Sequence, residues 1–293
     1  MRTSIGAGLL FVVVISPLFG SESDAALRDR LDRETAQAQS RIAPNAIASS
    51  GSHYWLLIGA AGSVAGSFGT HFQSDMMISN HRSVPQVVAI TWCAQAQSCL
   101  NGFELLDVTI PANSAINMPD IVGAYLGKSG LGALDLRART SAGGSLDTAA
   151  KIDATSRIWT PMANSVGTIF AGGTSSQSFP SANVQALLSG SPNGTILGLR
   201  QDANFRTNIG IYNDDRVNAH TFTIRIIGTS GQTTFTMTVP AFAMVQQAVP
   251  AGSYGNIGAV ITPDSSALGW SAYGSSNDNI SGDGWVQLAS QND

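Results

Sequence analysis

The stretch T-H-F-Q-S-D-M-M-I-S-N at residues 70–80 decides the fold, because A-N-F-R-T-N-I-G-I-Y-N at residues 203–213 repeats its pattern. The matching pairs are Phe72 and Phe205, Ser74 and Thr207, Met76 and Ile209, Ile78 and Ile211, and Asn80 and Asn213. Side chains alternate between the two faces of a β-strand, so each set of five shares one face. We therefore predict two equivalent strands and an internal repeat.

The remainder of the chain after residue 53 consists of short strand candidates separated by turn residues. The sequence T-I-P-A at residues 109–112 recurs as T-V-P-A at residues 238–241. Turn signals at about 8–12-residue spacing indicate a β-sandwich or barrel, and no βαβ alternation is present. We expect an all-β fold with two tandem antiparallel β-sandwich (immunoglobulin-like) domains over residues 53–182 and 183–291.

The N-terminal residues have the pattern of an export signal. Arg2 gives a positive n-region, residues 5–19 form an apolar h-region, and Ser23-Asp24-Ala25 fits a small-x-small cleavage site. Pro17 interrupts the apolar run, which is short for a membrane-spanning helix of about 20 residues. We expect a signal peptide over residues 1–25 and no membrane span after its cleavage, with an uncleaved anchor as the alternative.

Residues 26–52 are more charged than the rest of the chain. Acidic and basic side chains are interleaved at helical spacing, and Leu27 and Leu31 lie one turn apart. This pattern favours a solvated helix stabilised by pairs of opposite charge, and Pro44 ends it. We expect a charged helix and linker that act as a spacer, with an oligomerisation or tethering helix as the alternative.

The charge of the protein limits its partners. Only 12% of the residues are charged, compared with about 25% in ordinary soluble proteins. The net charge is −4 and no basic patch is concentrated in one segment, which argues against nucleic acid or an anionic membrane as the partner. With the export signal, this composition predicts a secreted, periplasmic or cell-surface protein.

The two cysteines, Cys93 and Cys99, flank a short turn after a predicted strand. Because disulfides form in exported proteins, we predict that they pair and fix the register of a hairpin. A metal site and a reactive thiol are the alternatives, but no histidine or aspartate accompanies the pair in the sequence.

Several motifs resemble those of a known group of proteins. The pattern aromatic-[RQ]-[ST]-[DN]-x-x-[IL]-x-N before a β-rich hairpin is similar to tandem domains of secreted, mostly uncharacterised bacterial proteins. The segment W-S-A-Y-G-S-S-N-D-N-I-S-G-D at residues 270–283 also resembles the closing turn of those domains. The first repeat lacks this Asp-Asn-x-[ST]-Gly-Asp turn. The resemblance implies export and the β-domain fold, and it implies no particular activity.

Aromatic residues are the candidates for ligand binding. If tryptophans lie on one exposed face, sugar rings can stack on them while Asn and Asp side chains bind the hydroxyls. The candidates are Trp159, Trp270, Tyr273 and Trp285. Core packing is the alternative for each of them. An extracellular polysaccharide or an envelope protein is the expected partner.

The segment at residues 277–283 is a candidate calcium loop. Oxygen-bearing side chains alternate along it at Asn277, Asn279, Ser281 and Asp283, as in loops that bind calcium. The twelfth position of such a loop would be Leu288, where calcium loops place a bidentate glutamate. A β-turn is the alternative, because Asn, Asp, Ser and Gly also dominate tight turns.

Two glycine-containing segments suggest nucleotide loops but do not match them. The segment G-A-Y-L-G-K-S at residues 123–129 has three residues between its glycine and Gly-Lys, where a phosphate-binding loop has four. The glycines at 59, 62, 66 and 69 have no strand-to-helix context. We expect a flexible loop in the first case and a mobile surface loop in the second.

The sequence contains no recognisable catalytic constellation. It has no Gly-x-Ser-x-Gly elbow, and Glu104 is the only glutamate after residue 53. A hydrolase of the glycosidase type needs two carboxylates, and two aspartate pairs are candidates for them. One pair is Asp75 with Asp107. The other is the adjacent Asp214 and Asp215, for which turn formation is the ordinary role. His220 is expected to be half-exposed at the start of a strand.

We therefore expect a non-enzymatic binding or structural protein without a cofactor. A carbohydrate-binding module is one alternative, and an extracellular hydrolase of unrecognised type is another.

Overall fold

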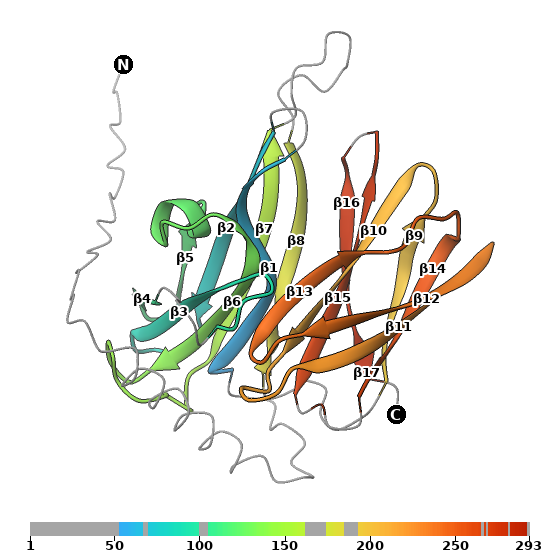
Figure 1. The fold of residues 1–293 in the computed structure, drawn as a ribbon. Helices are drawn as coiled ribbons and strands as arrows, with labels where there is room; N and C mark the ends of the chain where they lie inside the picture. Colours follow the sequence, from blue (N-terminus) through green and yellow to red (C-terminus); the bar gives the residue numbers. More distant parts are fainter. Residues whose placement is uncertain are drawn as a thin grey trace, which may run out of the picture.

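The computed structural model describes residues 53–66, 70–99, 105–161, 174–184, 193–264, 267, 269–280 and 282–291. Figure 1 shows that the described part of the chain consists mainly of β-strands joined by turns, with strands β1–β8 gathered on one side of the molecule and β9–β17 beside them. The predicted signal peptide (1–25) and the charged helix and linker (26–52) lie outside the described residues.

The strands of the first half are β1 (Trp55–Ala65), β2 (His71–Asn80), β3 (Gln86–Ala94), β4 (Leu105–Ile110), β5 (Ser114–Met118), β6 (Gly130–Arg139), β7 (Ile152–Pro161) and β8 (Thr174–Asn183). Those of the second half are β9 (Gly194–Gln201), β10 (Phe205–Asn213), β11 (His220–Gly228), β12 (Gly231–Val239), β13 (Ala243–Ala248), β14 (Gly255–Pro263), β15 (Trp270–Asp278), β16 (Gly284–Leu288) and β17 (Ser290–Gln291). One helical turn, η2 (Ile121–Tyr125), follows β5. No helix in the described ranges is long and apolar enough to cross a membrane.

All the strand pairs of the sheets are antiparallel, and the order of the strands recurs. The first half forms an eight-stranded sheet of order β4-β3-β6-β1-β8-β7-β2-β5, which bends at β1. The start of β1 pairs with β8, whereas its end pairs with β2. The second half has a five-stranded sheet, β12-β11-β14-β9-β17, and a four-stranded sheet, β13-β10-β15-β16. Strands β4-β3-β6-β1 and β5-β2-β7-β8 thus have the same order as β12-β11-β14-β9 and β13-β10-β15-β16.

The repeated stretches are the equivalent strands β2 and β10. In both strands the serine or threonine, the two aliphatic residues and the asparagine are buried on one face, and the phenylalanine at the start of the same face is partly buried, so the predicted shared face is confirmed. The side-chain amide of each asparagine donates to three backbone carbonyls. Nδ2 of Asn80 donates to Val84, Ile110 and Pro111. Nδ2 of Asn213 donates to the corresponding Asn218, Val239 and Pro240. Each asparagine therefore ties the loop after its own strand to the strand that ends in the repeated proline.

The turns after these prolines are equivalent as well. Asn113 and Phe242 occupy corresponding positions, and both have φ near +48°. Their amides donate to the carbonyls of Arg82 and Asp215 respectively. A left-handed backbone is ordinary for asparagine but costly for phenylalanine, so tertiary contacts must hold Phe242 in place.

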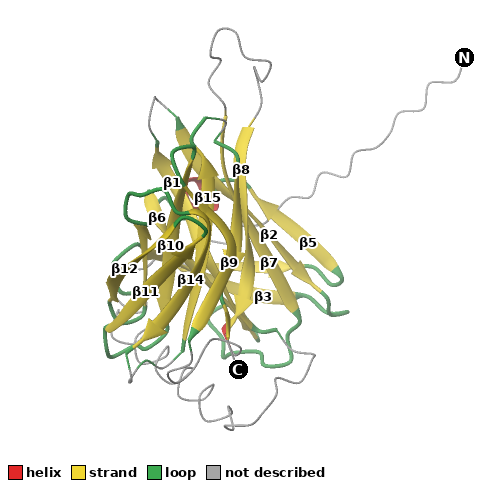
Figure 2. Cartoon of the chain, turned by 90° about the vertical axis from the view of Figure 1, so that its right-hand side faces the viewer, coloured by secondary structure: helices red, strands yellow, loops and turns green. Residues whose placement is uncertain are grey.

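Two apolar cores fill the molecule. One lies between the two sheets of the second half. The other lies inside the bent sheet of the first half and also includes Tyr212, Phe242, Met244 and Tyr273 from the second half. The two halves therefore share one continuous apolar junction, which Figures 1 and 2 show as strands of both halves packed side by side.

The predicted disulfide between Cys93 and Cys99 is confirmed. The loop that it closes does more than end a hairpin, because it adds to the edge of the four-stranded sheet. The amides of Ala96 and Cys99 donate to the carbonyls of Met244 and Phe242, at 2.7 Å each. The disulfide loop thereby protects the free edge of β13 and joins the two halves.

Several predictions about local structure were wrong. Gly59 and Gly62 are in strand β1 rather than in a surface loop, and Gly123 is in η2 rather than in a flexible loop. His220 is buried rather than half-exposed, and its two ring nitrogens are satisfied by the carboxylates of Asp215 and Asp264 at 3.0 and 2.9 Å.

Candidate functional site

The sheet β5-β2-β7-β8 presents a solvent-facing side that we call the open face. Its side chains lie in rows across neighbouring strands, which are about 4.8 Å apart. The rows are Gln73, Trp159 and Ser176; Asp75, Arg157 and Ser178; and Asn117, Met77, Thr155 and Pro180. The opposite side chains of the same strands, such as Met76, Ile78 and Ser156, are buried. Alternation along the strands therefore creates a mostly polar surface.

Trp159 is the aromatic residue of the open face. It is partly exposed, and the guanidinium of Arg157 lies 5.5 Å from the centre of its ring. Arg157 also binds the carboxylate of Asp75 at 3.0 Å, and the second oxygen of Asp75 accepts from the amide of Asp120 at 3.2 Å. These contacts orient a cation, a carboxylate and an indole within two adjacent rows.

The equivalent side of sheet β13-β10-β15-β16 is not exposed, and we call it the covered face. Strand register places Gly210 where Met77 stands, Tyr273 where Thr155 stands, and Gln246 where Asn117 stands. Met77 is 49% exposed, whereas Tyr273 is 2% exposed. The first half packs over the covered face, so only one of the two equivalent surfaces is accessible.

Tyr273 is the centre of the covered face. Its ring makes an edge contact with Phe179 of β8, at 5.2 Å between ring centres, and its hydroxyl donates to Gln246 at 2.7 Å. A Cβ atom on Gly210 would lie 2.2 Å from the ring, and one on Gly59 would lie 3.0 Å from it. These two glycines therefore make room for the tyrosine between the halves.

Polar contacts border this junction. Gln177 of β8 accepts from the Ser275 hydroxyl at 2.9 Å and donates to the Ser276 carbonyl and the Asn277 side chain. Gln95 of the disulfide loop donates to the carbonyl of Gln246. The junction thus has an aromatic centre and a polar rim, as stable interfaces do.

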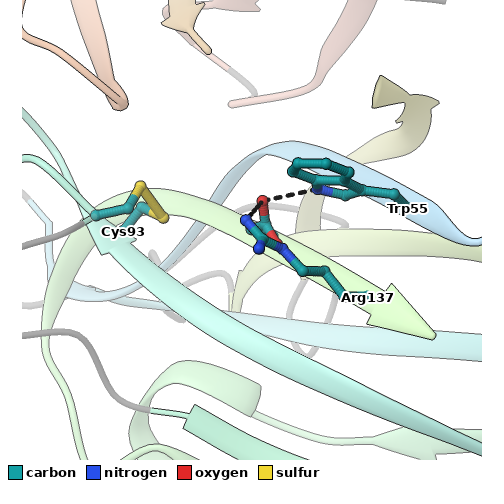
Figure 3. Close-up of a disulfide and its surroundings, with 5 residues drawn as sticks. Trp55, Cys93 and Arg137 are labelled. Atoms are coloured by element: carbon teal, nitrogen blue, oxygen red, sulfur yellow. Dashed lines mark hydrogen bonds and ion pairs between the residues drawn. A yellow bond between two sulfur atoms is a disulfide. The ribbon is translucent and has the colours of Figure 1, made fainter. Parts of the chain in front are cut away.

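A group of charged and aromatic side chains lies at one end of the junction. Figure 3 shows Arg137 beneath the ring of Trp55, close to the disulfide at Cys93. Asp135 binds Arg137 at 2.7 Å and accepts from the Trp55 indole at 2.9 Å. This ion pair is buried and satisfied on both sides, as a buried pair must be to persist.

A second arginine joins the group from the second half. The guanidinium of Arg216 lies 4.0 Å from the ring centre of Phe242 and 5.6 Å from that of Trp55. Its three nitrogens are buried without a hydrogen-bond partner among the described residues. Burial and the nearby Arg137 lower the pKa of Arg216 to about 10.

Asp214 adds a titratable carboxyl to this group. Burial raises its pKa to about 7, and the nearby Asp135 and Asp215 act in the same direction. Arg216 and Arg137 oppose the shift, but burial has the largest effect. The junction therefore contains a carboxyl that changes charge near neutral pH.

The structure separates the four aromatic candidates. Trp270 and Tyr273 are buried, Trp270 within the core of the second half and Tyr273 at the junction. Trp285 is partly exposed, but its indole donates to the carbonyl of Gly198 and its ring packs against Phe205. Trp159 is the candidate that lies on the open face.

The described calcium candidates use their side-chain oxygens in hydrogen bonds within the protein. Oδ1 of Asn277 accepts from Gln177, that of Asn279 accepts from Arg206, and that of Asp283 accepts from the Gly284 amide. Ser281 lies outside the described residues. Across the described ranges, no three His, Cys, Asp or Glu side chains are placed to hold a metal ion. Calcium binding at this turn stays a prediction.

The carboxylate pairs weighed for hydrolysis are engaged elsewhere. Asp75 binds Arg157 on β2, whereas Asp107 on β4 accepts from the amide of Gly143. Asp214 and Asp215 lie in the loop after β10, and Asp215 accepts from the amides of Val217 and Asn218. Asp215 therefore has the turn-forming role that was its ordinary alternative.

A cavity of about 300 Å³ lies beside the disulfide loop. Ala94 and Trp92 of β3, Gln97 and Ser98 of the loop, and Gly127, Lys128 and Ser129 after η2 line it. The segment at residues 123–129, which the sequence singled out, thus forms one wall of a concave site.

No protein-family model matches the chain, and no curated protein is significantly similar to it.

Proposed function

We propose that this chain is a non-enzymatic, secreted or cell-surface binding protein. In this proposal it consists of two tandem immunoglobulin-like β-sandwich domains, residues 53–182 and 183–291, and it binds its partner through the open face. The domain assignment is supported by the recurrence of strand order, of the Asn80 and Asn213 hydrogen bonds and of the turns at Asn113 and Phe242.

One observation carries the binding proposal. The two equivalent sheet faces differ in burial: the covered face is packed against the first half, whereas the open face remains accessible to solvent. The open face still carries an oriented aromatic and charged group, formed by Trp159, Arg157 and Asp75. A surface needed only for solubility does not require this arrangement.

An extracellular polysaccharide is the ligand that the open face fits best. An indole flanked by Gln73 and Ser176 offers an apolar surface for a sugar ring next to groups that bind hydroxyls. The surface spans several neighbouring strands, and Arg157 and Asp75 balance each other's charge. A neutral or weakly charged chain lying across the strands is therefore favoured over a small charged ligand.

The hydrolase alternative needs a pocket that gathers carboxylates or a histidine. The cavity beside the disulfide loop has neither among its lining residues. It therefore gives the alternative no support.

The test is retention of the purified protein on insoluble cellulose, chitin and bacterial peptidoglycan. We expect saturable retention on at least one of these polymers. Trp159→Ala should weaken this retention about fivefold or more, because it removes the stacking surface, which contributes of the order of 1 kcal/mol or more to binding.

Trp285→Ala is the matched control, because Trp285 is also partly exposed but lies on β16, a strand of the sheet that carries the covered face. It should bind as the native protein does. Equal loss of retention in both variants would contradict the assignment to the open face. Retention on an envelope protein fraction alone would replace the polysaccharide with a protein partner.

A further inference from the structure

The three sheets end in strands that have a neighbouring strand on one side within the described part of the chain. These edge strands are β4 and β5, β13 and β16, and β12 and β17. A free edge presents amide and carbonyl groups that can pair with another strand, so natural proteins usually shorten, charge or cover it. An edge strand without such protection can accept a strand from another molecule.

The edge strands other than β12 are short, charged or covered. Strands β5 and β16 have five residues each, and β17 has two. Strand β4 carries the carboxylate of Asp107. The amides of Ala96 and Cys99 in the disulfide loop donate to the edge of β13. Each of these edges therefore has a feature that opposes pairing with a further strand.

Strand β12 lacks these features. It has nine residues, G-Q-T-T-F-T-M-T-V, and none of them is charged or proline. Apart from the ladder to β11, the backbone of residues 231–238 makes no hydrogen bond within the described part of the chain. Alternate residues of an antiparallel edge strand direct their amide and carbonyl groups away from the sheet. The outer edge of β12 is thus long, neutral and unpaired among the described residues.

The internal repeat makes this difference specific to the second half. The repeated T-I-P-A and T-V-P-A align β4 with β12, and this alignment sets Asp107 at the place of Thr236. Strand register agrees, because Asp107 lies opposite Ala89 of β3 and Thr236 lies opposite Thr223 of β11. The first repeat therefore has a carboxylate on its edge strand where the second repeat has a neutral threonine.

We propose that a second copy of the protein pairs with β12, so that two β12 strands lie antiparallel about a two-fold axis. The register centred on Phe235 pairs all nine residues of the strand and sets Phe235 opposite its own copy. Thr234 then lies opposite Thr236 of the second copy. Threonine pairs and aromatic pairs across antiparallel strands stabilise a sheet. A symmetric pair of this kind also closes, which leaves neither β12 edge free.

The side chains of β12 are compatible with this pairing. Thr234, Thr236 and Thr238 are exposed on one face, whereas Met237 is buried and Phe235 is partly buried on the other. Pairing would therefore extend the threonine face of the sheet from one copy into the next and cover part of the Phe235 ring. This interface is separate from the open face, and the proposal does not depend on the proposed function.

The first test is sedimentation velocity of the purified protein over a range of concentrations. We expect a dimer whose fraction rises with concentration. Combined Thr234→Lys and Thr236→Lys should raise the dimer dissociation constant at least tenfold, because each lysine would face a lysine of the other copy. The matched control combines Thr221→Lys and Thr223→Lys, which add the same charge to the same sheet face on β11, one strand from the edge. The control should dimerise nearly as the native protein does.

A second test reads the register of the pair. The only two cysteines of the chain form the disulfide, so Phe235→Cys adds a single thiol. In the proposed register this thiol lies opposite its own copy, and mild oxidation should give a covalent dimer rapidly. Gln232→Cys is the control, because Gln232 would lie opposite Thr238 of the second copy. Its covalent dimer should form at least tenfold more slowly.

Several outcomes would overturn the proposal. A monomer at every concentration would do so, as would a dimer that the β12 lysines leave unchanged or that the β11 lysines weaken equally. Crosslinking at Gln232→Cys as fast as at Phe235→Cys would contradict the register. Far-UV circular dichroism checks that each variant is folded. If the double variant of β12 is unfolded, Thr236→Lys alone takes its place, with Thr223→Lys as its control and the same expected difference in direction.

Discussion

The open face and the covered face are built on equivalent strands but differ in what touches them. The covered face has Tyr212, Met244 and Tyr273 where the open face has Ser79, Ala115 and Thr155. Larger apolar side chains are enough to convert a solvated sheet face into an interface, because each buried aromatic residue removes a large apolar area from water. The backbone hydrogen bonds of the two sheets are of the same kind, so the sheet itself does not decide the partner.

The turns next to the two faces show the same contrast. Asn113 adopts its left-handed conformation at little cost, whereas Phe242 does so at a cost that its contacts offset. The ring of Phe242 lies against Arg216 and Tyr212 at the junction. A strained aromatic residue therefore marks the half whose face is used for packing.

The largest expected effect is on the covered face. Tyr273→Ala should lower the free energy of unfolding by about 3–5 kcal/mol, because it removes a buried aromatic ring from between the halves. Thr155→Ala, at the equivalent position of the open face, should change it by about 0.5 kcal/mol or less. Urea denaturation of both variants measures the difference. Similar losses of stability in the two variants would contradict the conclusion that one face is buried and the other is exposed.

A smaller effect is expected from the buried carboxyl of the junction. The folded protein holds the proton of Asp214 up to a pKa of about 7, compared with 3.8 as the ordinary value. Since the folded state binds more protons in this window, stability should fall as the pH rises from about 4 to about 7.

Asp214→Asn cannot ionise, so it should remove much of this fall. The variant should be more stable than the native protein at about pH 8, by on the order of 2 kcal/mol, and similar to it near pH 4. Thermal or urea unfolding across this range provides the measurement. An unchanged pH profile would show that Asp214 is not held as a neutral acid.

The smallest effect on stability is expected on the open face. The ion pair of Asp75 and Arg157 is partly exposed, with the arginine side chain 48% accessible. A double-mutant cycle of Asp75→Ala and Arg157→Ala should give a coupling energy of about 0.5 kcal/mol or less. The same variants should still reduce retention on the polysaccharide, since Arg157 orients Trp159. A coupling energy of several kcal/mol would indicate a structural role instead.

Much of the fold could be read from local patterns. Strands β2 and β10 were predicted at their observed positions because period-two alternation follows directly from one buried face. Strand β8 was missed, because T-S-S-Q-S-F-P-S-A-N is polar and shows no apolar alternation. Its Gln177 and Ser175 bind the second half instead of filling a core, so the usual signal is missing.

The candidate site was harder to predict for a related reason. Trp159 and Tyr273 both lie on strands among small and polar neighbours, and nothing in these local patterns distinguishes an exposed ring from one buried between two halves. Gly59 was assigned to a surface loop and Gly210 to a predicted strand, and neither local pattern indicates that these two glycines make room for the ring of Tyr273. Burial of the covered face depends on contacts between residues more than 90 positions apart in the sequence, such as Phe179 and Tyr273.

The sequence alone determined the β-class of the fold, the two equivalent strands with their shared face and the disulfide, because each depends on alternation, turn chemistry or close spacing along the chain. Only the tertiary structure decided which of two equivalent faces is open, where the charged junction lies and which segments enclose the cavity. These features arise from contacts between distant segments, and the free energy of such contacts depends on burial that no local pattern specifies.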